Sequence, residues 1–462
     1  MERSNKPNII FMIADDHRHS AIHAFGDEQV HTPNLDSLVQ DGVAFNNTYI
    51  TGGLTPAVCV PSRACVLTGT HALHASESQQ LNHQPGLTTI NPEIAVLPNV
   101  MRREGYHTFG TGKWHNDRQS FYEGFCDGGK IFMGGMSDHD KVPVFDFDPN
   151  GDYDDKNRYY GEKFSTDLFS DEAIQFIKNH QQEQPFFLYL AFTSPHDPRT
   201  APKEFADQYN PDKIKLPDNY MGEHPFDNGE MTIRDEKLAK WPRTPEAIRQ
   251  HIADYYAMIT HMDDRIGKIL RTLEETGELE NTIIVYTSDH GLAVGQHGLM
   301  GKQNMYDHSV RIPLIISGPG LPKGKQFNEL TCQYDIFPTL CDLVGVKIPQ
   351  TVEGKSLVPL IHGDINKVHD SIFSVYKDSQ RMVTDGEWKL IRYFIPWQHN
   401  FGTNRFQLFN LNEDPWEIND LSENPQYSEE LERMISIFND MQSKVRDPWA
   451  YRSVSEFVGP FD

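Results

Sequence analysis

The chain has 462 residues, a formal net charge of −24 and a hydrophobic fraction of 38%. This length exceeds a typical domain of about 100–200 residues, so it favours one large domain with a smaller one beside it. An aromatic fraction of 11% and recurring apolar segments argue against a collagen-like, coiled-coil or wholly disordered chain. The acidic balance argues against nonspecific binding to nucleic acid or an anionic membrane, but it allows an anionic substrate at a locally basic site.

The sequence shows no apolar run near the ~20 residues that a membrane span needs, so we predict no such span. The first residues carry no long apolar segment before a small-residue cleavage site. The chain as given is therefore expected to be cytoplasmic, or periplasmic or secreted if a signal peptide has been removed. The five cysteines are too few and of odd number for a disulfide scaffold, which predicts at least one free or chemically special thiol.

Short apolar segments alternate with helical patterns along most of the chain, which predicts βαβ units and a mostly parallel sheet. The clearest strands are 8–14, 186–193, 282–287 and 312–317. Each is nearly continuously apolar, as expected for a strand covered on both faces. A 3.6-residue periodicity predicts helices at 165–179, 244–276 and 335–344. Two stretches rich in Gly, Asp and Pro, 128–161 and 197–242, are predicted to be long surface loops that shape a pocket.

Beyond about residue 363 the pattern changes to short strands joined by turns. The predicted elements are strands at 371–376, 380–384, 388–393 and 406–410 and an amphipathic helix at 428–445. The sequence therefore predicts two domains. Residues 1–363 form a large α/β domain whose mostly parallel or mixed sheet is sandwiched by helices. Residues 364–462 form a smaller α+β domain with an antiparallel sheet.

Two polar groups directly follow predicted strands: Asp15-Asp16 and Asp289-His290. Taken alone, each could be a solvated turn, since Asp is common at strand ends. Ligands of open α/β sheets bind beyond the carboxyl ends of the strands, so the two groups are expected to meet at one edge. Three carboxylates and an imidazole predict a divalent-metal site. Carboxylates suit Ca²⁺, Mg²⁺ or Mn²⁺, and the imidazole leans toward Mn²⁺ or Zn²⁺.

Residues 59–69 read C-V-P-S-R-A-C-V-L-T-G. We expect Pro61 at the first position of a helix, where its missing N–H costs nothing. Cys59 would then lie just before a helix N-terminus, a position that favours an anion and lowers a thiol pKa. The alternative is a buried cysteine beside a helix cap. A disulfide between Cys59 and Cys65 is disfavoured, because residues six apart on a helix do not share a face.

This segment resembles the signature C-x-P-S-R-x-x-x-L-T-G of type I sulfatases, members of the alkaline phosphatase superfamily. The resemblance implies an alkaline phosphatase-like fold and sulfuric ester hydrolase activity. In that family the signature cysteine is oxidised to formylglycine, and the maturation machinery recognises C-x-P-x-R, here Cys59, Pro61 and Arg63. The resemblance thus implies that Cys59 is modified, and that a formylglycine-generating or sulfatase-maturing enzyme is a partner of this chain.

The resemblance extends along the chain in the family's order, through Gly112-Lys113-Trp114-His115, Ser194-Pro195-His196 and Gly301-Lys302. Taken alone, each of these lysines would be read as solvated and each histidine as structural. The resemblance implies that four of these side chains contact the sulfate group: Lys113, His115, His196 and Lys302. It also implies one divalent cation, with Ca²⁺ preferred and Mn²⁺ or Mg²⁺ as alternatives. Its ligands would be Asp15, Asp16, Asp289, His290 and modified Cys59.

The family mechanism can be carried over to these residues. A hydroxyl of the hydrated aldehyde at position 59 attacks sulfur, and His196 or Lys302 protonates the departing alcohol. His115 then takes a proton from the second hydroxyl, which expels sulfate and restores the aldehyde. Arg63 is expected to bond the diol or a metal-bound carboxylate and to hold the loop, because its guanidinium is a fixed fork of donors.

One position departs from the common pattern: His290 stands where many sulfatases carry Asn. Histidine occurs there in some sulfatases and in formylglycine-dependent phosphonate monoester and phosphodiester hydrolases, so such a hydrolase is the alternative function. The pair Asp15-Asp16 favours a sulfatase. An inactive relative that only binds sulfated glycans would lack the signature cysteine or the lysines, and none of them is missing.

The substrate is predicted from side chains in or near the loops. These are Trp114, Trp241, Trp397, Arg18, His19, His139 and Arg199. Each alone is more simply read as a solvated loop residue. As a group they favour a polar pocket over the apolar pocket of an aryl or steroid sulfatase. The sequence therefore predicts a sulfated carbohydrate as the substrate.

Overall fold

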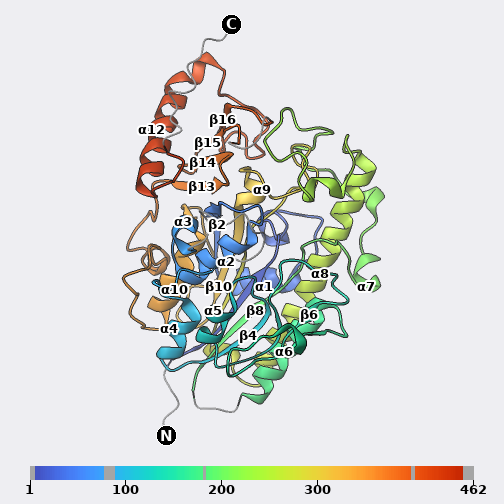
Figure 1. Cartoon of the computed structure of the whole chain (residues 1–462), viewed down its shortest axis with the longest axis vertical. Coiled ribbons are helices and arrows are strands. Elements are labelled where there is room, and N and C mark those ends of the chain that lie inside the picture. Colours follow the sequence, from blue (N-terminus) through green and yellow to red (C-terminus); the bar gives the residue numbers. More distant parts are fainter. Residues whose placement is uncertain (1–5, 77–88, 181–183, 397–400, 451–462) are drawn as a thin grey trace.

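A computed structural model describes residues 6–76, 89–180, 184–396 and 401–450 (Figure 1). Its largest element is a nine-stranded sheet with the strand order β11-β2-β10-β9-β1-β8-β4-β5, and β12 pairs with β2 off this path. The strands are β1 (Asn8–Ala14), β2 (Gly42–Tyr49), β4 (His107–Lys113), β5 (Asp127–Phe132), β8 (Phe186–Ala191), β9 (Thr282–Ser288), β10 (Arg311–Ser317), β11 (Lys325–Phe327) and β12 (Thr331–Cys332).

The centre of this sheet is parallel. β1 pairs in parallel with both β8 and β9, and β4 pairs in parallel with β8 and β5. β10 runs antiparallel to β9 and to β2, so the sheet is mixed. The mixed α/β class predicted from the sequence is confirmed. Parallel neighbours matter for the site, because they bring several strand C-termini to the same edge of the sheet.

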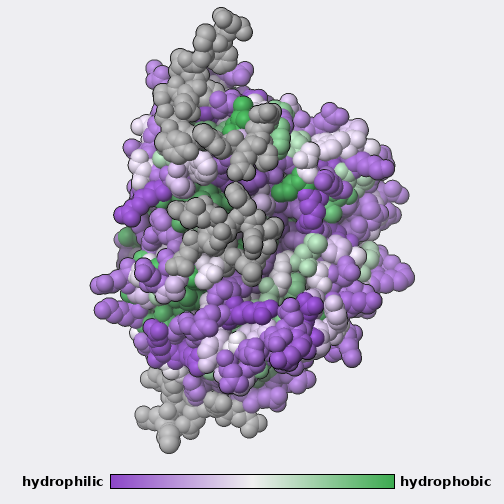
Figure 2. Space-filling view, in the orientation of Figure 1, coloured by the Kyte–Doolittle hydropathy of each residue, from purple (hydrophilic) through white to green (hydrophobic). Residues whose placement is uncertain are grey.

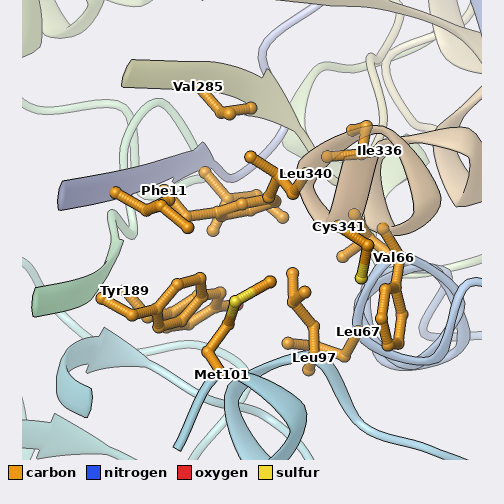
Figure 3. Packing of buried hydrophobic residues seen from close by; sticks show 14 of the residues in the cluster. Phe11, Val66, Leu67, Leu97, Met101, Tyr189, Val285, Ile336, Leu340 and Cys341 are labelled. Atoms are coloured by element: carbon orange, nitrogen blue, oxygen red, sulfur yellow. The ribbon is translucent and has the colours of Figure 1, made fainter. Parts of the chain in front are cut away.

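Helices cover both faces of the large sheet (Figure 1). In β1 the alternation of side chains sends Phe11 into one core cluster and Met12 into another. Figure 3 shows the first cluster, in which Phe11, Tyr189 and Val285 of the sheet face three helices: α2 (Cys59–Thr68), α4 (Leu97–Arg103) and α10 (Ile336–Leu343). On the other face the sheet packs on α1 (Pro33–Asp41), α6 (Ser165–Asn179) and α8 (Pro245–Glu275).

Shorter elements complete the part around the large sheet: α3 (Ala72–Ala75), α5 (Arg118–Gly124), α7 (Lys203–Ala206), α9 (Asp307–Val310), α11 (Val358–His362), and the hairpin of β6 (Pro143–Val144) and β7 (Tyr159–Tyr160). The face of the molecule drawn in Figure 2 is mainly hydrophilic, with hydrophobic residues in small separate areas. Within the described ranges, no helix is both long and apolar enough to cross a membrane. All five cysteines are free thiols, where the sequence predicts at least one free or chemically special thiol.

A second sheet follows the large one and has the order β16-β15-β14-β13-β3. Its antiparallel strands are β13 (Ile372–Tyr376), β14 (Gln380–Thr384), β15 (Trp388–Tyr393) and β16 (Arg405–Asn410), and α12 (Ser428–Lys444) packs on one face. This smaller antiparallel sheet was expected, but its fifth strand was not. β3 (Gly52–Gly53) reaches in from the segment just before α2 and pairs in parallel with β13. The boundary between residues 363 and 364 stays a prediction.

The predicted and observed elements differ at particular places. The strands at 8–14, 380–384 and 388–393 and the helix at 165–179 match β1, β14, β15 and α6, and the other predicted elements differ by one or two residues at their ends. The prediction of a loop over 128–161 is wrong where β5 pairs with β4 and where β6 pairs with β7, and the predicted loop over 197–242 contains the short helix α7. Neither β2 nor β4 was predicted. β4 reads H-T-F-G-T-G-K, in which polar and glycine residues hide the apolar run that marks a buried strand.

Candidate active site

The ends of four neighbouring strands carry the predicted site residues to one edge of the large sheet. Asp15 follows β1, Lys113 ends β4, His196 lies shortly after β8, and Asp289 follows β9. Backbone hydrogen bonds fix these segments side by side: the amide of Asp15 donates to the carbonyl of Ser194 at 3.0 Å. The amide of Asp289 donates to the carbonyl of Ala14 at 3.1 Å. The parallel register thus brings together residues that lie up to 274 positions apart in the chain.

Cys59 comes from a different element, the helix α2, whose residues are all buried. The expectation that this helix begins at Pro61 is wrong, because α2 begins at Cys59 itself. Proline is tolerated here because the amides of the whole first turn have no partner within the helix. Gly53 lies against this turn, and a Cβ on it would lie 2.2 Å from Cγ of Pro61. The Cys59 side chain therefore leaves the first turn of a fully buried helix beside the strand ends.

Arg63 holds three of the strand ends together. Its Nε donates to Oδ2 of Asp289 at 3.0 Å, its Nη1 donates to the carbonyl of Lys113 at 2.8 Å, and its Nη2 lies 3.8 Å from Oδ2 of Asp15. Burial alone would lower the pKa of this guanidinium, but the carboxylates raise it above its usual value. Arg63 therefore bonds a predicted metal ligand rather than reaching outward, which agrees with one of the two roles expected for it.

Two lysines bridge the aspartates and the thiol. Lys113 Nζ forms an ion pair with Oδ2 of Asp15. Lys302 Nζ donates to Oδ1 of Asp16 at 2.8 Å and to Sγ of Cys59 at 3.4 Å. Burial would raise the pKa of the Cys59 thiol, but Lys113, Lys302 and nearby histidines hold it well below its usual value. The residue at position 59 therefore lies where the protein stabilises negative charge.

Backbone and carboxylate neighbours fix the orientation of His290. Its Nδ1 lies 2.9 Å from the carbonyl oxygen of Gly291, which can only accept, so Nδ1 carries a proton. Nε2 faces Cys59 Sγ at 3.3 Å and Asp16 Oδ1 at 3.2 Å. This is the orientation of a metal-binding imidazole, whose other nitrogen donates to a backbone carbonyl. Burial would lower the pKa of His290, but Asp289 and Asp16 raise it to about 9, so a cation bound here would replace a proton on Nε2.

His196 is held in the same way, with Nδ1 2.7 Å from the carbonyl oxygen of Asp197 and Nε2 3.9 Å from Asp16 Oδ2. Burial would lower its pKa, but Asp16 and Asp15 raise the pKa of His196 to about 9. His115 differs: burial and Lys113 lower its pKa to about 4, although it contacts Cys59. At neutral pH His196 can therefore give a proton, and His115 can take one.

The residues of this edge fit a divalent cation. Metal-ligating atoms lie within 4.8 Å of one another in two overlapping buried groups: Asp15, Asp16, Cys59 and His196, and Asp15, Cys59, Asp289 and His290. Oδ1 of Asp15 is buried without a hydrogen-bond partner in the described structure. Carboxylate oxygens are the ligands of hard cations. Three aspartates balance Arg63, Lys113 and Lys302, so an added divalent ion would leave the cluster positive and suited to an anionic ester.

Comparisons with known proteins agree with this geometry. The sulfatase family model matches residues 7–346, which is well over half of the chain. The chain belongs to the sulfatase family. A second model, the C-terminal region of N-sulphoglucosamine sulphohydrolase, matches residues 295–444. The resemblance drawn from the signature is thus confirmed, and the protein is a type I sulfatase that hydrolyses sulfuric esters.

Individual relatives match this sulfatase over nearly its whole length. An arylsulfatase of Clostridium perfringens is 30% identical over 94% of this chain and 93% of its own. An N-acetylglucosamine-6-O-sulfatase of Bacteroides thetaiotaomicron is 27% identical over 96% of this chain and 88% of its own. A solved structure, described as a complex with the substrate D-glucosamine-2-N,6-O-disulfate, superposes with a TM-score of 0.78 at 24% identity, covering 96% and 99% of the two chains.

Phosphonate hydrolases share the fold. The phosphonate monoester hydrolase of Agrobacterium radiobacter superposes with a TM-score of 0.72 at 21% identity and covers 95% of this chain and 96% of its own. This likeness concerns the fold alone. The family match therefore favours sulfate over phosphonate.

One charged group beside His196 was not predicted from the sequence. Arg234 forms a two-pronged ion pair with Asp197, at 2.5 and 2.9 Å, and also contacts Asp235 at 2.5 Å. Asp197 Oδ1 in turn lies 3.4 Å from Nδ1 of His196. Asp197 directly follows Ser194-Pro195-His196, which is the one signal that could have marked it. Nothing in the loop around Arg234 indicates its partner.

The residues predicted to line a carbohydrate pocket are spread over the molecule. Trp114 is buried in the core against Phe121, Phe125 and Tyr189, so its assignment to a surface pocket is wrong. His139 is buried beneath the site, with Nε2 2.9 Å from the carbonyl of His196. The other members separate as well: Trp241 stacks on Arg243, Arg199 contacts His251, Arg18 and His19 line a separate cavity, and Trp397 lies outside the described residues.

Proposed function

We propose that this sulfatase removes sulfate from a sulfated carbohydrate, with formylglycine formed from Cys59 as the reacting residue. The observation that carries the proposal is the position of Cys59. Its Sγ lies 3.3 Å from Nε2 of His290 and 3.4 Å from Nζ of Lys302, at the edge where three aspartates converge. A lone buried cysteine would not need this arrangement of charges.

The carbohydrate assignment is supported by the relatives and by the surroundings of the site. The named relatives include the N-acetylglucosamine-6-O-sulfatase above and an ulvan-active sulfatase of Formosa agariphila, 30% identical over 78% of this chain and 66% of its own. Outward from His196 the structure is polar: Arg234 is half-exposed, and Gln303 Nε2 donates to Asp235 at 2.9 Å. Hydrogen-bonding groups of this kind suit sugar hydroxyls better than an aryl or steroid ring.

The chain's own residues divide the work of the reaction. Lys113 and Lys302 place positive charge where the sulfate oxygens would bind, which stabilises the charge that develops in the transition state. His196, whose pKa is raised, is the group that gives a proton to the departing alcohol, with Lys302 as the alternative donor. His115, whose pKa is lowered, takes the proton whose removal releases sulfate. Arg63 keeps Asp289 and the end of β4 in register.

We propose that Asp15, Asp16, Asp289 and His290 hold one divalent cation, Ca²⁺ in the first instance. When bound, the ion would supply fixed positive charge that polarises the ester and acidifies a neighbouring hydroxyl. His290 contributes a nitrogen ligand among the carboxylates, so Mn²⁺ is the first alternative and Mg²⁺ the second. The chain's contribution is the preset orientation of these four side chains: backbone groups hold Asp289 and His290, and Lys113 and Lys302 hold Asp15 and Asp16.

The formylglycine proposal is tested by mass spectrometry of the tryptic peptide that contains Cys59. We expect the loss of sulfur in exchange for oxygen when the protein is made together with a sulfatase-maturing enzyme, the partner proposed for this chain. Protein made without that enzyme provides the matched control. An unmodified thiol in both samples would contradict the proposal.

The substrate class is tested by sulfate release from sulfated mono- and oligosaccharides, beside matched aryl sulfate and aryl phosphonate esters. We expect the highest kcat/KM on a sulfated sugar and a clear preference for sulfate over phosphonate. Activity confined to small aryl esters would refute the carbohydrate assignment and leave the sulfatase intact. A preference for the phosphonate would support the alternative that His290 raises.

A further inference from the structure

A cavity lies near the active site, and none of its lining residues belongs to the proposed catalytic set. It encloses about 410 Å³ between the segment after β1, helix α8, the start of β10 and the loop at 415–417. We call it the Arg18 pocket, after the residue at its back wall. A cavity of this size accommodates a molecule as large as a monosaccharide.

The two sites share a wall but no side chain. Arg18 lies two positions after Asp16, and the Arg18 backbone packs against Gly291, the neighbour of His290. A Cβ on Gly291 would lie 2.8 Å from Cβ of Arg18 and 2.2 Å from the carbonyl oxygen of His308. Any larger residue at position 291 would push the metal-ligand loop and the pocket apart. The pocket is therefore close to the catalytic edge yet closed off from it.

Arg18 is the feature that calls for a ligand. It is 4% exposed, its Nε and Nη1 have no hydrogen-bond partner in the described structure, and no carboxylate of the described residues lies within ion-pair distance of it. In the described structure its guanidinium lies over the ring of Tyr255 and contacts the hydroxyl of Tyr256, which itself donates to Asp27 at 2.6 Å. A buried charge without an opposite charge is costly, so this guanidinium is built to meet an anionic oxygen.

The other walls combine two neutral hydrogen-bonding side chains with charged ones that already have partners, since Asp307 pairs with Arg311 and Glu417 with Lys389. His308 is 8% exposed and both of its ring nitrogens lack partners in the described structure. Burial and the neighbouring His297 and Arg18 lower the pKa of His308 well below its usual value, so the ring stays neutral, with one donor and one acceptor. Asn219 donates to the carbonyl of Trp416 at 3.0 Å, and its Oδ1 has no partner there. These groups suit hydroxyls rather than further charges.

The rim adds an aromatic face and negative charge. Trp416 is 37% exposed and lines the pocket, offering a flat apolar surface next to polar groups. Asp27, Glu28 and Asp218 also line it, so a multiply sulfated chain would be repelled at the entrance. A ligand with one carboxylate, several hydroxyls and a flat ring face meets all of these conditions.

We propose that the Arg18 pocket binds a hexuronate, with the carboxylate on Arg18, the hydroxyls on His308 and Asn219, and the sugar ring against Trp416. The choice of a sugar acid rests on the proposed carbohydrate function, but binding at the pocket does not depend on sulfatase activity. The ligand has two sources. It is either a uronate residue of the substrate chain or a free uronate released during polysaccharide breakdown.

The test is a ligand-observed NMR titration of the whole protein with glucuronate, and with glucose as the uncharged match. We expect saturable binding of glucuronate and none of glucose. Trp416→Ala and Arg18→Gln should each weaken glucuronate binding about tenfold or more, because each removes a main contact. Ile418→Ala provides the control, since Ile418 lies in the same loop, is similarly exposed at 42%, and does not line the pocket.

The outcomes separate cleanly. If Arg18→Gln fails to fold, Trp416→Ala and Asn219→Ala still decide the question. Glucuronate binding that matches glucose, or that survives the pocket substitutions, overturns the proposal even if sulfate release is normal. Where binding is seen, a sulfated disaccharide that carries a uronate identifies the source: competition with glucuronate indicates the substrate's own residue, and independent binding indicates a free uronate.

Discussion

Two buried ionic clusters in this molecule use the same residue types to different ends. The first surrounds Cys59 and pairs Asp15 with Lys113, Asp16 with Lys302, and Asp289 with Arg63. The second lies where the C-terminal sheet meets the large sheet: Lys389 Nζ is 2.7 Å from both Asp307 and Glu417, and Arg311 is 3.2 Å from Asp307. The second cluster joins α9, β10, β15 and the loop after β16.

The difference is in what each cluster encloses. In the second, the carboxylates face cations or backbone amides, and the ions act as a cross-link between segments. In the first, the same pairs enclose a thiol whose pKa is held well below its usual value, together with histidines of opposite pKa shift. Buried charge alone therefore does not mark an active site. A reactive residue at the centre of the charges, at the carboxyl ends of parallel strands, does.

The largest effect is expected from Cys59→Ala. Without the residue proposed to become formylglycine, the enzyme should lose sulfatase activity by about 10³-fold or more, because the proposed nucleophile is gone. The melting temperature should change little, since the surrounding ion pairs remain. Cys65→Ala is the matched control: Cys65 is a buried free thiol on the same helix, outside the cluster. It should keep activity and lose about 1 kcal/mol of stability.

The second comparison exchanges one lysine in each cluster. Lys302→Met should lower kcat/KM by about 10²-fold, because it removes charge from the reacting group. Its cost in stability should be smaller, because Asp16 keeps His290 and His196 beside it. Lys389→Met should instead destabilise the fold by about 3–5 kcal/mol, since it leaves buried Glu417 without a cation and leaves Asp307 with Arg311 alone. Sulfate release and urea denaturation of both variants provide the measurement. If Lys389→Met lost activity at full stability, the structural assignment of the second cluster would be wrong.

Much of the first cluster could be predicted from the sequence because its signals are local. Asp15-Asp16 and Asp289-His290 directly follow strands that are continuous in apolar residues, and the signature places Cys59 and Arg63 four positions apart. Parallel strands then bring these ends together without further information. The same reasoning located α6, α8 and most of the C-terminal sheet, where the periodicity is strong.

What could not be predicted depends on contacts between distant segments. Nothing local indicates that Gly52–Gly53 joins the C-terminal sheet, a pairing made possible by a glycine at φ 72° that lies against Val375. The ion pair between Arg234 and Asp197 also joins segments that are distant in the sequence, and so does the whole second cluster. Trp114 was misplaced because it stands between Lys113 and His115, and neighbours along an extended chain point to opposite sides.

A smaller effect is expected from His290→Asn, which replaces the nitrogen ligand of the proposed cation with an amide oxygen. Activity of chelator-treated enzyme should return with Ca²⁺ in both proteins, but recovery with Mn²⁺ relative to Ca²⁺ should fall in the variant, because an imidazole favours the softer ion. The melting temperature in each metal gives a readout that does not depend on turnover. An unchanged Mn²⁺ to Ca²⁺ ratio in both readouts would remove His290 from the metal ligands.

The smallest effect concerns the second cluster and pH. Burial and the adjacent Asp307 raise the pKa of Glu417 from 4.5 to about 7, although Lys389 opposes the shift. Between these two values the folded protein holds a proton that the unfolded chain has released, so this group's contribution to stability is present below pH 4.5 and is lost as the pH rises to about 7. Glu417→Gln keeps the shape and removes the titration. The melting temperature of the variant relative to the wild type should therefore rise between pH 4.5 and about 7. If the melting temperatures of the two proteins instead changed in parallel with pH, Glu417 would be ionised throughout, and Lys389 would outweigh the burial of both carboxylates.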